Sequence, residues 1–355
     1  MQSAFEKPME RMKKPEKTEH SAETLPAVEC KVDSREGEDH LTNRVEWDKI
    51  TMLFPRNPAE NGRKKDYFMR YQIVSDSSSN VFHVEGLSYT TVPMKIIAGE
   101  KEYVDCETLD VRGMVDDLKV YKGKSGSSCA NAQEWLDAFG DADMVFGVTI
   151  SRNLSGSFNA AEAAAREYAE EHPDRKIHIF DTLSAGPEMA MVVEKIGQLV
   201  NQGLAFEEIV AQVREYQNHC HILFCLESMN NLARNGRVNP AVAKIASVLG
   251  IRACGDAHNG QIIPTQKPRG QKKATETLAA MIRQRGFTNG SWLRIAHCFG
   301  ENQARLLIDE LKKDFPNARY TVEPTGALCS FYAEEGGLMI AMEGAFNEVN
   351  NVNAI

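Results

Sequence analysis

Serine-rich turns are the part of this sequence where residue types and spacing could do chemistry. The stretch FGVTISRNLSGSFNAA, residues 146–161, passes from an apolar, β-branched run through Ser155, Gly156 and Ser157 into an alanine-rich segment. Hydroxyls and free backbone N–H groups at the start of a helix can hold an anion, although a lone serine there is most often a helix cap. A phosphate, a carboxylate or an acyl group under attack would each suit such a turn.

Two further turns have the same character. Asp76 and Ser77 follow the apolar segment YQIVSD, and Ser127 and Ser128 precede ANAQEWLDAF. Taken alone, Ser127 and Ser128 fit the role of caps for the helix expected after them. Loops that follow parallel strands meet at one edge of the sheet, where ligands bind. Together the turns predict a cluster of neutral donors suited to an anionic head group.

Familiar phosphate-binding and catalytic motifs do not fit these turns. YKGKSGSS has Leu118 where a P-loop needs glycine, and NLSGS lacks the flanking glycines of the nucleophile elbow GxSxG. HCHILFC, residues 219–225, is interpreted as a core strand with buried cysteines rather than a metal site. An enzyme that uses the serine cluster, either a serine hydrolase or a phosphotransferase, stays open as an alternative, as does an interaction module.

Composition and charge narrow the class of protein. Of the 355 residues, 42% are apolar and 26% are charged, as in ordinary soluble globular proteins, and the net charge of −9 disfavours nucleic acid and anionic membranes. No stretch approaches the roughly 18 apolar residues of a transmembrane helix, and the start has no secretory pattern. The eight cysteines, which form no CxxC pair, are interpreted as reduced thiols of a cytoplasmic protein.

Alternating strands and helices must position the turn at Asp76 and the turn at Ser155. Apolar segments typical of strands lie at 71–76, 142–150 and 176–182. Patterns typical of helices lie at 159–171, 187–203 and 206–217. This alternation predicts a parallel sheet with helices on both faces.

The last third of the chain has a different pattern. A strand is expected at 220–228, a helix at 240–250, and a hairpin at 251–267 that turns at Asn259–Gly260. Further strands are expected at 292–298, 318–324 and 337–343. The fold class is therefore α/β, with an N-terminal parallel-sheet α/β domain at 67–219 and a C-terminal α+β domain at 220–350. Residues 1–66 carry mixed charges and prolines, and are expected to form a flexible extension.

Seven stretches, in order over about residues 71–345, resemble the DegV family of bacterial lipid-binding proteins. They are IVSDSSSNV, SGSSCANAQEWLDAF, VTISRNLSGSFNAA, IHIFDTLSAGPEMAMVV, LESMNNLARNGRV, GIRACGDAHNGQIIPTQKPRGQKKA and IAHCFGENQARLL. The resemblance implies a fatty-acid carrier without catalytic activity or cofactor. Its acyl chain would lie in a tunnel between the two domains, and its carboxylate would be presented to a separate fatty acid kinase.

The resemblance also implies site residues. Those expected to bind the fatty-acid carboxylate are Ser127, Ser128, Ser155, Gly156, Ser157, Thr325 and Gly326. Those expected as possible head-group or partner contacts are Arg237, His297, Asp76 and Ser77. The sequence departs from the family where Cys129 and Ala130 replace Gln and Pro, and where Pro324 stands in place of a head-group histidine. His297, in another family motif, could compensate.

Overall fold

The computed structural model describes residues 70–243 and 250–352. The expected extension at 1–66 and most of the helix expected at 240–250 lie outside the described residues. Within 240–250 the structure describes a helical turn, α7 (Pro240–Ala243).

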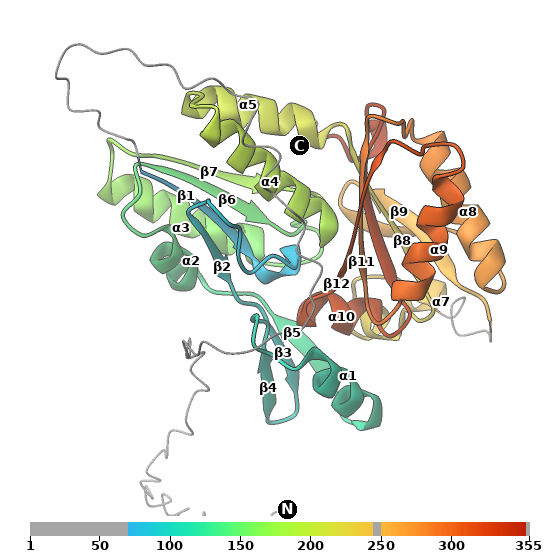
Figure 1. Ribbon diagram of the computed structural model, residues 1–355. Coiled ribbons are helices and arrows are strands. Elements are labelled where there is room, and N and C mark those ends of the chain that lie inside the picture. The colour runs from blue at the N-terminus through green and yellow to red at the C-terminus, as the bar shows by residue number, and fades with distance from the viewer. Residues whose placement is uncertain (1–69, 244–249, 353–355) are drawn as a thin grey trace, which may run out of the picture. The chain divides into compact units, whose positions relative to one another are not determined.

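A parallel sheet of four strands forms the first half of the described chain. Its order is β2 (Tyr89–Val92), β1 (Tyr71–Asp76), β6 (Met144–Thr149) and β7 (Lys176–Asp181). All three pairings are parallel. Helices α2 (Ala132–Phe139) and α3 (Ser157–Glu171) pack on one face, and α4 (Pro187–Asn201) and α5 (Phe206–Gln217) on the other (Figure 1). The predicted α/β fold class is confirmed.

The sequence of strand β6 explains its place in the middle of a sheet that helices cover on both faces. All six of its residues are buried, because helices cover both faces of the sheet. Phe146 and Val148 face the core that includes α4 and α5, whereas Val145 faces the core with α2 and α3. Each such side chain contributes roughly 1.5–3 kcal/mol through burial.

A second sheet has six strands in the order β10-β9-β8-β13-β11-β12. The strands are β8 (Cys220–Leu226), β9 (Ala253–His258), β10 (Gln261–Gln266), β11 (Trp292–His297), β12 (Arg319–Pro324) and β13 (Leu338–Glu343). Only the β11–β12 pair is parallel. Helices α8 (Gln271–Gln284) and α9 (Glu301–Leu311) pack against it. Asn259 and Gly260 have φ values of 48° and 72°, which confirms the predicted hairpin turn. The division into domains near residue 219 stays a prediction.

A small third sheet was not expected from the sequence. It consists of β4 (Lys101–Val104), β3 (Lys95–Ala98) and β5 (Ser125–Ser128), and helix α1 (Val111–Val120) lies beside it (Figure 1). The interpretation of Ser127 and Ser128 as helix caps is therefore wrong, because both lie in β5 and pair with β3. The cap of α2 is Asn131, which forms a capping box with Glu134.

Candidate functional site

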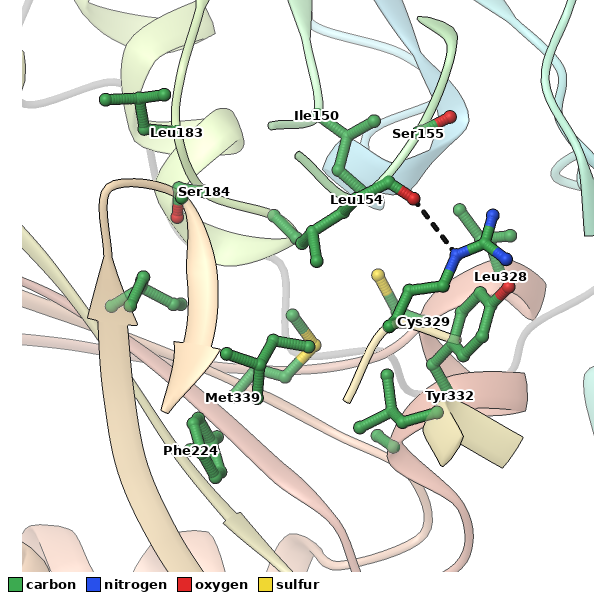
Figure 2. Close-up of a pocket in the computed structure, with 18 of the residues that line it drawn as sticks. Ile150, Leu154, Ser155, Leu183, Ser184, Phe224, Leu328, Cys329, Tyr332 and Met339 are labelled. Carbon is green, nitrogen blue, oxygen red and sulfur yellow. Dashed lines mark hydrogen bonds between the residues drawn. The ribbon is translucent and has the colours of Figure 1, made fainter. Parts of the chain in front are cut away.

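An apolar pocket lies where loops of the parallel sheet meet the second sheet. Together with the open solvent at its mouth, it spans about 870 Å³ of space that no protein atom fills. Its wall includes Ile150, Leu154, Leu183, Phe224, Leu328 and Met339 (Figure 2). Most of the side chains in its wall are apolar, which suits a hydrocarbon ligand.

One end of the pocket is polar, and we call it the polar end: Ser127, Ser155, Arg237 and Tyr332, all of which line the pocket. The Ser127 and Tyr332 hydroxyl oxygens lie 2.7 Å apart and share a hydrogen bond. The guanidinium of Arg237 lies 5.8 Å from the centre of the Tyr332 ring. Its Nε donates to the carbonyl oxygen of Leu154 at 3.1 Å (Figure 2). Two hydroxyls and a cation thus converge where the apolar wall ends.

Three separate elements position the polar end. Ser127 is held in β5 opposite Ile96, and Tyr332 comes from helix α10 (Ala327–Ala333). Arg237 follows helix α6 (Asn230–Arg234), where Gly236 has a φ of 75°. Glycine tolerates this left-handed conformation, and the Arg237 N–H returns to the carbonyl oxygen of Leu232 at 2.8 Å. The turn fixes where the Arg237 side chain begins.

Asp76 is the centre of a buried hydrogen-bond cluster next to this site. Its carboxylate accepts from the Ile150 N–H at 3.0 Å and from the Ser157 hydroxyl at 2.7 Å, as well as from the N–H and hydroxyl of Ser78. Burial raises the pKa of Asp76, although these hydrogen bonds oppose the shift. The Ser77 hydroxyl accepts from the Met94 N–H at 3.0 Å. The cluster ties the ends of β1 and β6 to the start of α3.

A second carboxylate, Asp105, holds the start of α10. It accepts from the N–H groups of Ala327 and Leu328 at 2.7 and 3.1 Å, and burial raises its pKa to about 6. The neighbouring Gly326 N–H donates to the Asn80 side-chain oxygen at 2.9 Å. Asp105 therefore fixes the helix that carries Tyr332 to the pocket.

Thr325 and His297 join β12 to β11 near the same helix. The Thr325 N–H donates to the His297 carbonyl oxygen at 3.0 Å, and the Thr325 hydroxyl shares a hydrogen bond with Ser330 at 2.6 Å. Burial lowers the pKa of His297, whose Nδ1 is buried without a hydrogen-bond partner among the described residues. Pro324 is exposed and stands in register with His297.

The predicted site residues thus fall into two groups. Ser127, Ser155 and Arg237 line the pocket. The others lie outside its lining, and their role toward a ligand stays a prediction; they are Ser128, Gly156, Ser157, Thr325, Gly326, His297, Asp76 and Ser77. Sequence reasoning missed Tyr332, since it contacts Ser127 across 205 positions and no local spacing signals it.

Comparison with known proteins decides the family. The model of the DegV family of uncharacterised proteins matches residues 70–343, nearly all of the described chain. The chain belongs to the DegV family. A DegV domain-containing protein of Streptococcus gordonii is 37% identical over 280 residues, which cover 78% of this chain and 99% of that protein. The resemblance expected from the sequence is confirmed.

Solved DegV structures share the fold. A DegV family protein from Eubacterium eligens, loaded with heptadecanoic acid, is 37% identical with a TM-score of 0.75, covering 77% of this chain and 99% of its own. The fatty acid kinase B3 protein of Streptococcus pneumoniae, loaded with linoleic acid, is 35% identical with a TM-score of 0.76, covering 78% and 99%. Both were solved with a long-chain fatty acid.

Neither a membrane-spanning helix nor a metal site is found among the described residues. None of the described helices is long and apolar enough to cross a membrane. In the same part of the chain, no three His, Cys, Asp or Glu side chains gather in a way that could hold a metal ion.

Proposed function

We propose that this DegV protein binds a long-chain fatty acid in the apolar pocket and holds its carboxylate at the polar end. The observation that carries the proposal is the Ser127–Tyr332 hydroxyl pair beside Arg237, at one end of a mostly apolar cavity. Each buried methylene contributes about 0.8 kcal/mol, and a carboxylate that leaves water needs partners. The two linings match the two ends of a fatty acid.

The roles of the polar end follow from its chemistry. Hydroxyls of Ser127 and Tyr332 can both rotate their protons toward a carboxylate, and hydrogen bonds to a charged group are stronger than neutral ones. Arg237 is the only lysine or arginine among the described residues that line the pocket, so it supplies the positive charge. Two of its N–H groups already donate to the carbonyl oxygens of Leu154 and Asn235, which hold the guanidinium in place.

We further propose that the bound carboxylate is presented to a separate fatty acid kinase, which forms an acyl phosphate. The similarity to the fatty acid kinase B3 protein of Streptococcus pneumoniae supports this partner. The protein itself would act as a carrier in the cytoplasm, without catalysis or a cofactor. Six of the described cysteines are free thiols, which fits that compartment; they are Cys129, Cys220, Cys225, Cys254, Cys298 and Cys329.

A serine hydrolase is the alternative that the pocket favours least. A nucleophilic serine needs a general base within hydrogen-bond reach. Within the described chain, no histidine lines the pocket, and the Ser127 hydroxyl pairs with a tyrosine. This arrangement suits binding of an acid better than attack on an ester.

Native mass spectrometry of the full chain purified from bacteria tests the proposal. We expect the protein to carry a bound molecule whose mass, measured after chloroform extraction, is that of a long-chain fatty acid. Added oleic acid should replace this molecule. Absence of both a co-purified and an added acyl chain would overturn the carrier proposal. Turnover of an ester or a nucleotide by the purified protein would instead support an enzyme.

A further inference from the structure

A second polar pair lies away from the polar end, and its serine lines the pocket. Ser184 lines the pocket in the loop that precedes α4, and Glu188 lies in the first turn of that helix. The Ser184 hydroxyl donates to the Glu188 carboxyl oxygen at 2.9 Å. Ser184 and Glu188 have exposed fractions of only 2% and 1%.

This pair is unusual for a wall that serves only hydrocarbon. A buried carboxyl group is costly unless it is well hydrogen-bonded, and the Ser184 hydroxyl is its one side-chain partner among the described residues. Burial raises the pKa of Glu188 to about 8, so the carboxyl group is mainly protonated at neutral pH. The three residues that follow it in α4, Met189, Ala190 and Met191, are fully buried.

The pair also lies far along the pocket from the polar end. Leu183 and Ser184 lie on the opposite side of the pocket from Tyr332 (Figure 2). A fatty acid with its carboxylate at Ser127 would therefore bring its chain, not its head group, to Ser184.

We propose that Ser184, positioned by Glu188, binds a hydroxyl group carried on the acyl chain, so that the preferred ligand is a hydroxylated long-chain fatty acid. The inference rests on the proposed function. While the Ser184 hydroxyl donates to Glu188, the lone pairs of its oxygen are free to accept from a ligand hydroxyl. A plain saturated chain leaves those lone pairs without a partner in a dry wall.

Competition binding with matched ligands tests the inference. The delipidated full-length protein is titrated with octadecanoic acid and with three hydroxy derivatives of it. One carries its hydroxyl near the carboxylate, and the other two carry it at a distal position, either mid-chain or at the terminal carbon. We expect one of the two distal positions to bind about 3- to 10-fold more tightly than octadecanoic acid. In Ser184→Ala this preference should disappear, while affinity for octadecanoic acid is kept or improved.

Two variants control for loss of fold. Glu188→Gln keeps an oxygen that accepts from Ser184, and should keep the preference. Thr149→Val removes a nearby buried hydroxyl that donates to the Phe180 carbonyl oxygen at 3.3 Å and does not line the pocket, and should also keep it. Circular dichroism confirms that each variant is folded before binding is measured.

The outcomes separate the two proposals. If the wild type binds octadecanoic acid at least as tightly as every distal hydroxy acid, the inference is wrong and the carrier function stands. If the preference exists but survives in Ser184→Ala, the assignment to Ser184 is wrong. If the wild type binds none of these acids, the proposed function fails, and the inference fails with it.

Discussion

The hydroxyl of Ser157 donates a hydrogen bond to the buried carboxylate of Asp76 at 2.7 Å. This contact joins the first residue of α3 to the last residue of β1. Asp76 also accepts from the Ile150 N–H. Its carboxylate thus binds two residues that follow it by 74 and 81 positions in the sequence. Neither Asp76 nor Ser157 lines the pocket. Their contacts hold the frame on which the pocket is built.

Ser157→Ala should therefore lower stability rather than ligand affinity. The substitution leaves Asp76 with one donor fewer in a fully buried site, which should lower the free energy of unfolding by about 1–3 kcal/mol. Urea unfolding followed by circular dichroism measures the loss, and fatty-acid titration of the folded variant should match the wild type. Unchanged stability together with weakened binding would place Ser157 in the head-group site instead.

Ser127→Ala should weaken fatty-acid binding by about 1–3 kcal/mol, because the variant removes one donor to a charged group. Ser128→Ala is the matched control, since it changes the next residue of the same strand, which does not line the pocket. Isothermal titration with oleic acid compares the two variants. Equal affinity in wild type and Ser127→Ala would remove Ser127 from the carboxylate site.

Much of the fold could be predicted from the sequence because several strands are mostly apolar and several helices span 11 to 15 residues. β6 and β8 are buried along their whole length, and α4 begins with proline as expected. The small third sheet was missed because β5 has the sequence SGSS, which has little strand propensity. Its place is set by pairing with β3 rather than by its own residues.

The site was predictable only in part, for a related reason. Ser127 and Ser155 belong to serine-rich stretches that sequence reasoning can find, although Ser127 lies in a strand and not in a turn, and Arg237 was found through the family resemblance. Tyr332 and the Ser184–Glu188 pair take their places through tertiary packing of α10 and α4. Spacing along the chain could also not separate Ser157, which faces Asp76, from Ser155, which faces the pocket.

Arg237→Gln should weaken binding of a fatty acid but not of the corresponding fatty alcohol. The guanidinium lies within the polar end, so its charge favours a carboxylate and contributes little to a neutral head group. We expect a loss of about 1 kcal/mol for the acid, and a weaker dependence of its affinity on salt. Equal losses for oleic acid and oleyl alcohol would show that Arg237 acts through packing, for example by holding the Leu154 carbonyl.

Glu188→Gln should change how stability depends on pH. Burial raises the pKa of Glu188 from 4.5 to about 8, so between these values the folded state keeps a proton that the unfolded chain releases. Stability from this group is therefore fully present below about pH 4.5 and is lost as the pH rises toward 8. Glutamine does not titrate. The free energy of unfolding of the variant should therefore rise relative to that of the wild type, by at most about 1.4 kcal/mol per pH unit.

The difference between the two proteins isolates Glu188 from other titrating groups. Asp105, whose pKa burial raises to about 6, is present in both proteins, so its contribution cancels in the difference. Urea unfolding at several pH values across this window gives the free energy of unfolding of each protein. The variant-minus-wild-type value should rise steadily with pH and level off above about pH 8. A difference that stays constant would mean that Glu188 is ionised in the folded protein throughout, and that its carboxylate has partners beyond Ser184.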